Sequence, residues 1–243
     1  MIAVQFDCVA KSFARHAGRM LIRHRVKHWL RGWRHERFQA LTDVSFALRD
    51  GECLGIVGPN GAGKSTVLNL ITGLCLPTGG RVTVNGKVAP LLELGSGFHA
   101  DLTGAENVRL NAALLGLSRK QAAERFPAIV EFADIGDFIH EPLRTYSSGM
   151  MMRLAFAVAI HVNADILVLD EVLGVGDQAF FEKCAQRIED FRNAGKTLIC
   201  VSHSLNSIES LCHRAIWLDH GRVIQDGPAA DVLRAYRGAS GHA

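Results

Sequence analysis

The sequence predicts an α/β fold with a mostly parallel core sheet and an inserted α-helical subdomain. First, short apolar strands alternate with helical patterns over most of the chain. Second, a glycine-rich loop at 58–65 follows a buried strand and opens a helix. Third, a helical stretch at about 100–147 separates that loop from another buried strand, 166–170, which ends in a carboxylate.

The composition indicates a single globular domain, 1–243. Of the 243 residues, 48% are hydrophobic and 21% are charged, which is an ordinary balance for a packed core. No uncharged apolar run reaches the length of about 18 residues that a membrane helix needs. The six cysteines include no Cys-x-x-Cys pair and lie mostly in apolar surroundings, which predicts buried thiols in a reducing cytosol.

The first half of the chain reads as strands around one short helix. Residues 65–71 are predicted to form that helix, with Gly73 placed to end it. The predicted strands are 3–9 and 44–48, both at a sheet edge, 52–57, which is buried, and 81–84 and 88–92, which flank an Asn85-Gly86 turn.

The second half alternates between helices and strands. Amphipathic patterns predict helices at 105–115 and around 120–132, inside the helical subdomain. The strand 197–201 and a hairpin around Gly221 add to the core sheet. Further helices are predicted at 178–192, 205–212 and 229–236.

The glycine-rich loop fits a phosphate-binding pattern. The pattern G-x-x-x-x-G-K-[ST] is matched by Gly58, Pro59, Asn60, Gly61, Ala62, Gly63, Lys64 and Ser65. Glycines let backbone N–H groups turn toward phosphate oxygens, and the helix N-terminus adds partial positive charge. We expect Lys64 to hold the β- and γ-phosphates, Ser65 to ligate Mg²⁺ and Thr66 to add a phosphate contact. The alternative, a plain glycine-rich turn, is disfavoured by the flanking strand and helix.

Polar residues follow two other predicted core strands. Asp170 ends an aliphatic run, so we expect its carboxylate at the carboxyl edge of the sheet, where it can ligate Mg²⁺. Glu171 comes next and is placed to orient and deprotonate an attacking water. His203 follows the strand 197–201 and is a candidate sensor of the γ-phosphate. The alternatives are a surface acidic pair and a structural histidine.

The segment Tyr146-Ser147-Ser148-Gly149-Met150 opens an apolar helix. Small residues at a helix start expose N–H groups and a Ser hydroxyl to an anion, which makes Ser147 and Gly149 candidate nucleotide contacts. An ordinary helix cap explains the same residues equally well. If the segment contacts a different ATP from the one that Lys64 holds, the working unit is a head-to-tail dimer with two sandwiched nucleotides.

In their order along the chain, these motifs resemble the ATP-binding subunit of an ABC transporter, from Ala3 to Tyr236. A strict signature of that family reads Leu-Ser-Gly-Gly-Gln, whereas 146–150 reads Tyr-Ser-Ser-Gly-Met. This departure looks like the branch that exports polysaccharides, namely O-antigen, capsule or teichoic-acid chains. The same likeness is carried by two further stretches, Leu-Glu-Leu-Gly-Ser-Gly-Phe-His at 92–99 and Glu-Val-Leu-Gly-Val-Gly-Asp-Gln-Ala-Phe-Phe-Glu-Lys-Cys at 171–184.

The resemblance implies a P-loop NTPase of the ABC ATPase type that has an antiparallel β edge subdomain beside its core sheet and binds ATP and Mg²⁺. It implies that Asp177 is the loop aspartate that couples two ATP sites. The glutamine with which most of these ATPases touch Mg²⁺ and the membrane partner falls near Glu93 or Leu94, so Glu93 is the candidate here. An aromatic residue usually stacks on adenine, and Phe13 matches by position, with Phe38 as a competitor because an insertion follows Phe13.

The resemblance also implies the partners. They are a second copy of the chain and two copies of an integral-membrane permease at the cytoplasmic face of the bacterial inner membrane. The cargo is a lipid-linked polysaccharide, with O-antigen favoured over capsule or teichoic acid, and we expect no C-terminal carbohydrate-binding domain after Tyr236. Among non-transport classes, DNA-repair ATPases need long coiled coils between these two motifs, but Gly149 lies only 85 positions after Lys64. Translation-type ATPases carry two nucleotide-binding cassettes in one chain, and this sequence contains one phosphate loop, which disfavours that class.

The chain contains a basic insertion at 15–37 that a minimal ATPase of this type lacks. It holds eight basic residues and one acidic residue, a net charge of +7, so the remainder of the +3 chain carries −4. Apolar residues at helical spacing between the basic ones predict an amphipathic helix for an anionic membrane surface or a lipid-pyrophosphate head group. The alternative is a helix that packs on its own domain. Nucleic acid is ranked last because no nucleic-acid-binding fold accompanies the patch. The apolar residues are Ile22, Val26, Trp29 and Trp33.

Overall fold

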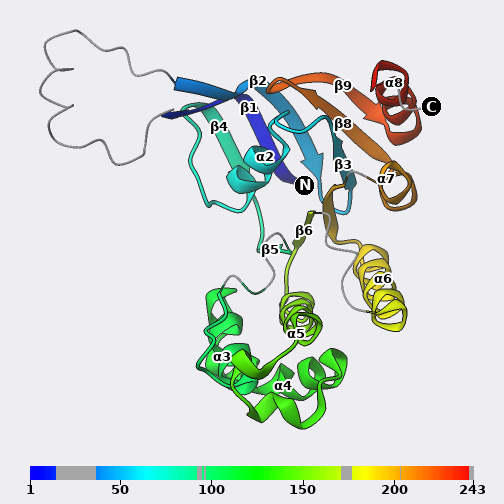
Figure 1. Cartoon of the computed structure of the whole chain (residues 1–243). Helices are drawn as coiled ribbons and strands as arrows, with labels where there is room; N and C mark the ends of the chain where they lie inside the picture. The colour runs from blue at the N-terminus through cyan, green and yellow to red at the C-terminus, as the bar shows by residue number, and fades with distance from the viewer. Residues whose placement is uncertain (15–36, 92–94, 96, 171–176, 203, 241–243) are drawn as a thin grey trace, which may run out of the picture.

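The computed structural model describes residues 1–14, 37–91, 95, 97–170, 177–202 and 204–240, with the backbone alone for Asp170 and Ser240. Its strands form two sheets, and helices cover the second sheet (Figure 1). The predicted α/β class with a mostly parallel core sheet is confirmed.

The first sheet is antiparallel and has the strand order β2-β1-β4. Val4 pairs with Leu48 on one side and with Val84 on the other, so β1 is the central strand. The prediction of an edge strand at 3–9 is therefore wrong, because alternating residues reveal a buried face but not the number of neighbouring strands. The strands are β1 (Ile2–Ala14), β2 (Arg37–Arg49) and β4 (Gly79–Val84).

The second sheet has the order β5-β6-β7-β3-β8-β9, and its described pairs are parallel except for β8 with β9. The strand β3 lies between β7 and β8, so the glycine-rich loop leaves from the middle of the sheet. The strands are β3 (Cys53–Val57), β5 (Val88–Pro90), β6 (Ile166–Asp170), β7 (Thr197–Val201), β8 (Arg214–Asp219) and β9 (Arg222–Pro228).

The predicted turn at Asn85-Gly86 does not join two paired strands. The strand before it, β4, pairs with β1, and the strand after it, β5, pairs with β6. Non-local partners fix the connection: Nδ2 of Asn85 donates to the Ile2 carbonyl at 2.9 Å, and the backbone N–H of Lys87 donates to Oδ2 of Asp165 at 3.0 Å. The turn is therefore a crossover between the sheets.

Side chains alternate between two cores on the opposite faces of the second sheet. On β3, Leu54 and Ile56 pack into one core with α2 (Lys64–Ile71) and the antiparallel sheet. Cys53 and Val57 point into the other core, which the later helices share. The glycine-rich loop that leads into α2 and the helical subdomain thus belong to different layers of the fold.

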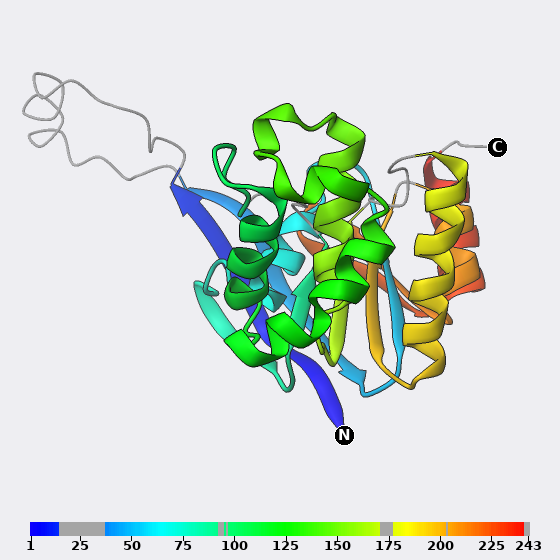
Figure 2. The same ribbon diagram turned by 90° about the horizontal axis from the view of Figure 1, so that it is seen from below.

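The helical subdomain lies apart from the antiparallel sheet in Figure 1 and in front of the strands in Figure 2, where it is green. Two capping boxes start its first helices, Thr103 with Glu106 and Ser118 with Gln121. The predicted helices at 105–115 and 120–132 are confirmed. The elements are α3 (Gly104–Leu114), α4 (Arg119–Ala133), the 3₁₀ helices Gly136–His140 and Leu143–Thr145, and α5 (Ser148–Ile160).

The remaining helices agree with their predicted positions. Thr72 ends α2 and Gly73 follows with φ +75°, as expected for a helix that stops at glycine. In the described part of the chain, no helix combines the length and the apolarity needed to cross a bilayer. These helices are α6 (Gln178–Asn193), α7 (Leu205–Leu211) and α8 (Ala229–Ser240).

The cysteines, all within the described residues, are free thiols. Four are buried and Cys75 is half-buried, as predicted for apolar surroundings. The prediction fails for Cys8, which is exposed. A register shift interrupts β1 between Phe6 and Val9, and Cys8 has φ +47°, so this β-bulge breaks the alternation that would bury its side chain.

The basic insertion emerges from the tip of the β1–β2 hairpin. Of the segment predicted at 15–37, only Arg37 lies among the described residues, so the predicted amphipathic helix is outside the description. The flanking residues are placed: Ala14 pairs with Arg37, and Phe13 pairs with Phe38. The chain therefore leaves the fold and returns to it at one pair of neighbouring backbone positions.

Candidate functional site

The glycine-rich loop connects the carboxyl end of β3 to the first turn of α2, as predicted. Among the described residues, no side chain caps the start of α2, so its first N–H groups are available to an anion. Gly58 has φ +152°, and a Cβ there would lie 2.1 Å from the carbonyl oxygen of Leu218. Only glycine fits at this position.

Lys64 places its ammonium group inside the loop. The side chain is buried, and Nζ donates hydrogen bonds to the carbonyl oxygens of Gly58 at 2.7 Å and Pro59 at 3.1 Å. A cation held this close to the first helical turn adds to the positive potential of the helix start. The loop, the helix N-terminus and Lys64 together form an anion-binding site.

A cavity of about 300 Å³ lies against the loop. Among the described residues, glycines and small side chains line most of it, with one aromatic residue, Phe38, which suits a ligand with both a phosphate and an apolar part. The described lining residues are Phe38, Ala40, Asn60, Gly61, Ala62, Gly63, Lys64, Ser65, Thr66 and Val201.

The carboxyl ends of β6 and β7 meet beside this cavity. Val201 lines the cavity, and the backbone of Asp170 pairs with Val201. The acid-tipped strand therefore ends next to the loop, as its sequence predicts for parallel strands. The side chain of Asp170 and the residues Glu93, Glu171 and His203 lie outside the description.

The structure places Phe38 at the cavity. Phe13 is its cross-strand partner but does not belong to the described lining. Instead, Nζ of Lys11 lies 4.8 Å from the centroid of the Phe13 ring and also donates to the Leu76 carbonyl at 2.7 Å. The geometry thus favours Phe38, the competitor, over the positional match Phe13.

Tyr146 and Ser147 fix the start of α5. The Tyr146 hydroxyl donates to the carbonyl oxygen of Phe138, and burial raises the pKa of this phenol. Oγ of Ser147 accepts a hydrogen bond of 3.2 Å from the backbone N–H of Met150, so Ser147 is the N-cap. Ser147 and Ser148 are exposed, and the described lining of the Lys64 cavity does not include them. The helix cap is therefore confirmed, and no described contact joins this helix start to the cavity beside this chain's own phosphate loop.

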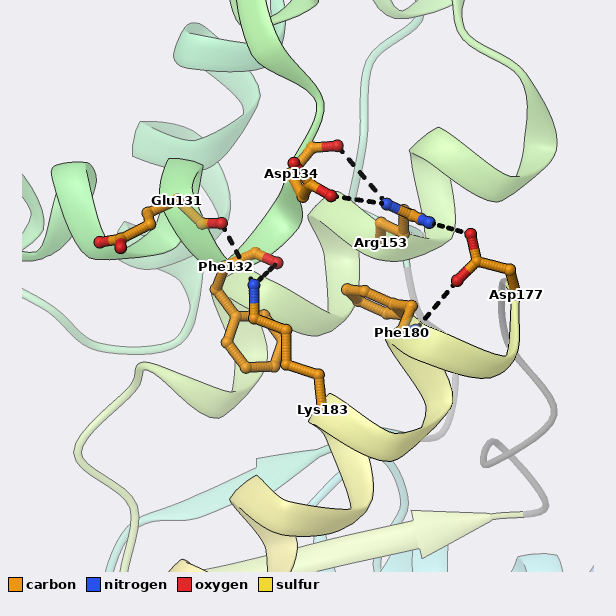
Figure 3. A network of polar contacts seen from close by, with 7 residues as sticks. All are labelled: Glu131, Phe132, Asp134, Arg153, Asp177, Phe180 and Lys183. Carbon is orange, nitrogen blue, oxygen red and sulfur yellow. Dashed lines mark hydrogen bonds and ion pairs between the residues drawn. The ribbon is translucent and has the colours of Figure 1, made fainter.

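Asp177 also caps a helix and is not among the described residues that line the Lys64 cavity. Its Oδ1 accepts from the backbone N–H of Phe180 at 2.9 Å, and its Oδ2 faces Arg153 (Figure 3). The structure therefore separates the predicted residues into two groups. The loop and Phe38 surround one cavity, whereas Ser147, Gly149 and Asp177 lie at other helix starts.

The turn between β8 and β9 braces the phosphate loop. The N–H of Gly221 donates to the Ala62 carbonyl at 2.9 Å, and its carbonyl accepts from the N–H of Thr42 at 2.8 Å. Gly221 has φ +75°, and a Cβ there would lie 2.5 Å from the Ala40 carbonyl oxygen. The sequence marks Gly221 as a turn residue, but no local signal reveals these contacts.

Comparison with known proteins identifies one family. The family model described as ABC transporter matches residues 41–174. The chain is 49% identical, over 84% of its length, to the O-antigen export system ATP-binding protein RfbB of Klebsiella pneumoniae, of which it covers 82%. It is 43% identical, over 98% of its length, to RfbB of Myxococcus xanthus, of which it covers 56%. It is 48% identical, over 83% of its length, to the teichoic acids export ATP-binding protein TagH of Listeria innocua serovar 6a, covering 60% of that protein.

Solved structures agree with the fold. A dimeric structure of the ATP-binding cassette MJ0796, in a post-hydrolysis state bound to ADP and Pi, matches with a TM-score of 0.72. The structural alignment covers 93% of this chain and 98% of the MJ0796 chain, and the two sequences are 24% identical. The ATP-binding cassette fold predicted from the motifs is confirmed.

We predict that Gly221→Ala weakens nucleotide binding and lowers the free energy of unfolding by about 1–3 kcal/mol. The new Cβ would displace the turn from Ala40 and strain the hydrogen bond to Ala62. Thermal denaturation and titration with a fluorescent ATP analogue measure the two effects. Gly195→Ala is the matched control, because Gly195 has φ +70° but a Cβ there meets no described atom within 4 Å. Equal losses in both variants would contradict a bracing role.

Proposed function

This chain belongs to the ABC transporter family, and we propose that it is the ATP-hydrolysing subunit of an exporter of lipid-linked polysaccharide. The observation that carries the ATPase role is the cavity formed by the glycine-rich loop, the uncapped start of α2 and the buried Lys64. The similarity to O-antigen and teichoic-acid export proteins over most of the chain supports the choice of cargo class.

In this proposal the loop binds the phosphates of ATP. The first N–H groups of α2 and the Lys64 ammonium neutralise the β- and γ-phosphates, because among the described residues that line the cavity these are the positive groups. The turn at Gly221 holds the loop in this shape before the nucleotide arrives. Binding therefore needs little rearrangement of the backbone.

The edge of the sheet also fits Mg²⁺. Ser65 lines the cavity, and Asp170 ends β6 beside Val201 of that lining, so these two residues are the proposed ligands, with Glu93 as a further candidate. When bound there, the ion adds positive charge beside the phosphates.

We assign hydrolysis to residues at the ends of β6 and β7. Glu171 orients and deprotonates the attacking water, and His203 contacts the γ-phosphate. Lys64 stabilises the charge that develops on the transferred group.

Two copies of the chain act together in this proposal. Ser147 and Gly149 lie outside the Lys64 cavity of their own chain, which supports their use on the ATP of a second copy. The two copies then close head to tail around two nucleotides, with Asp177 coupling the sites. Closure drives two copies of an integral-membrane permease, so the chain works at the cytoplasmic face of the inner membrane.

A teichoic-acid-type polymer is the second candidate cargo. The identities to the Klebsiella O-antigen protein and to the Listeria teichoic-acid protein, 49% and 48%, differ too little to separate the two. The basic insertion after Ala14 favours O-antigen-like export. Co-purification of the permease and analysis of the polymer that it exports would decide between them.

We predict that Glu171→Gln binds ATP but accumulates as a closed dimer, with kcat lowered by about 100-fold or more. The amide preserves the shape of the carboxylate but cannot take the proton of water. Size-exclusion chromatography with ATP and a phosphate-release assay measure the two properties. Glu182→Gln, an exposed position on α6, is the control that should behave like the parent. Parental turnover in Glu171→Gln would exclude Glu171 as the base.

We predict that Phe38 stacks on adenine, so Phe38→Ala should weaken ATP binding by about 10-fold. Phe13→Ala is the matched control, since Phe13 is the cross-strand partner and contacts Lys11 instead. Binding of inorganic tripolyphosphate, which lacks the base, should not change in either variant. A larger loss of ATP affinity in Phe13→Ala than in Phe38→Ala would show that Phe13, not Phe38, stacks on adenine.

We predict that the basic insertion binds an anionic membrane surface and can be removed without unfolding the chain. Because Ala14 and Arg37 are paired, an Asn-Gly turn in place of residues 15–36 should close the hairpin. The shortened chain should keep its unfolding temperature and ATP turnover but lose sedimentation with phosphatidylglycerol vesicles. Phosphatidylcholine vesicles and added salt are the controls. Equal sedimentation of both chains would refute membrane binding by the insertion.

A further inference from the structure

Arg153 joins the helical subdomain to the start of α6 (Figure 3). Its Nη2 atom, reaching from α5, is 2.5 Å from Oδ2 of Asp177. Its Nη1 atom is 3.5 Å from Oδ2 of Asp134, the residue that ends α4. One guanidinium fork therefore spans carboxylates from two separate elements.

Asp177 is held in a defined position and charge state. The backbone N–H of Phe180, and after it the charge of Arg153, keep the pKa of the Asp177 carboxyl below its usual value. The carboxylate is therefore ionised at neutral pH and bridges the α6 N-terminus to α5.

Arg153 is the more rigid partner of this bridge. Its side chain is 18% exposed, whereas that of Asp177 is 62% exposed. The guanidinium carbon lies 5.0 Å from the centroid of the buried Phe180 ring, which restricts its rotamers. Because the Arg153 side chain is largely buried, solvent screens this ion pair less than it screens a pair between two exposed residues, and the pair is correspondingly stronger.

Aromatic packing and Lys183 strengthen the same junction. The buried rings of Phe132, Phe156 and Phe180 come from α4, α5 and α6, with centroids 5.7–6.2 Å apart. From α6, Nζ of Lys183 donates to the carbonyl oxygens of Glu131 at 3.3 Å and Phe132 at 3.0 Å. The start of α6 is therefore packed on the helical subdomain.

We infer that Arg153 is a positioning residue for ATP hydrolysis, which fixes Asp177 relative to Ser147 and so couples the two ATP sites of the dimer. This rests on the proposed function, in which Ser147 contacts the ATP of the second copy. Arg153 lies within the first two turns of the helix that Ser147 caps, so a displacement of this helix start is carried to Asp177. Arg153 is not among the described residues that line the Lys64 cavity, so it acts through Asp177 rather than on its own chain's nucleotide.

The test compares ATP turnover in the full chain and two variants. Arg153→Met keeps a long stem against Phe180 but removes the donors. Asp177→Asn keeps a good N-cap acceptor but removes the charge. Each variant should lower kcat by about 10-fold and reduce the Hill coefficient for ATP toward one, while the half-saturating ATP concentration stays within about twofold. The double variant should be no slower than either single one, because both remove the same interaction.

Two further variants separate positioning from general destabilisation. Arg153→Lys restores the charge but offers one ammonium group in place of a fork, so we expect partial recovery of kcat and cooperativity. Arg192→Met is the matched control on α6: it removes an arginine whose contacts are Glu189 and the Ser210 carbonyl, and should leave turnover unchanged. Thermal unfolding of every variant checks the fold.

Two results would overturn the inference. One is a parental kcat and Hill coefficient in Arg153→Met. The other is a double variant whose loss is the product of the two single losses. Failure of the proposed function gives a different result. In that case the parent chain would not bind a fluorescent ATP analogue, and the Glu171→Gln variant would not form an ATP-dependent dimer.

Discussion

Main-chain atoms from distant parts of the sequence crowd the phosphate loop, and the geometry of the site depends on this crowding. The Leu218 carbonyl occupies the space that a side chain at Gly58 would need, and Gly221 joins Ala62 to Thr42 through its own peptide groups. The loop, the antiparallel sheet and the β8–β9 hairpin therefore form one frame. A frame of backbone contacts holds the binding groups in place before the ligand arrives, which is the condition for tight phosphate binding.

The parallel sheet divides the molecule into layers with different tasks. One face packs against α2 and the antiparallel sheet, where the cavity and Phe38 lie. The other face shares its core with α5 and α6, so the helical subdomain is continuous with the helix that Asp177 begins. A motor needs both a fixed nucleotide site and a part that transmits motion. In the proposed function, the sheet supplies the first, and the junction of α4, α5 and α6 supplies the second.

The sequence predicts the local features well and the non-local ones poorly. Helices α3 and α4 are predictable because Thr103 and Ser118 cap them through residues three positions away. The carboxyl end of β6 is predictable because an aliphatic run before an acid is itself local. By contrast, three features depend on partners far along the chain, and the periodicity of the sequence does not reveal such partners. These features are the central position of β1, the crossover at Asn85 and the place of Phe38 in the cavity. The bridge between Arg153 and Asp177 belongs to this second group.

The hairpin tip at Ala14 and Arg37 is a position where the chain can vary in length with little effect on the rest of the fold. Chain length between two residues that are already paired adds to the free energy of the fold only logarithmically, by about 0.6 kcal/mol for each doubling of a flexible loop. Segments of different length and charge can therefore be exchanged at this position while β1, β2 and the phosphate loop stay unchanged. Under the proposed function, the membrane contacts made at this tip can therefore change without altering the frame that holds the nucleotide.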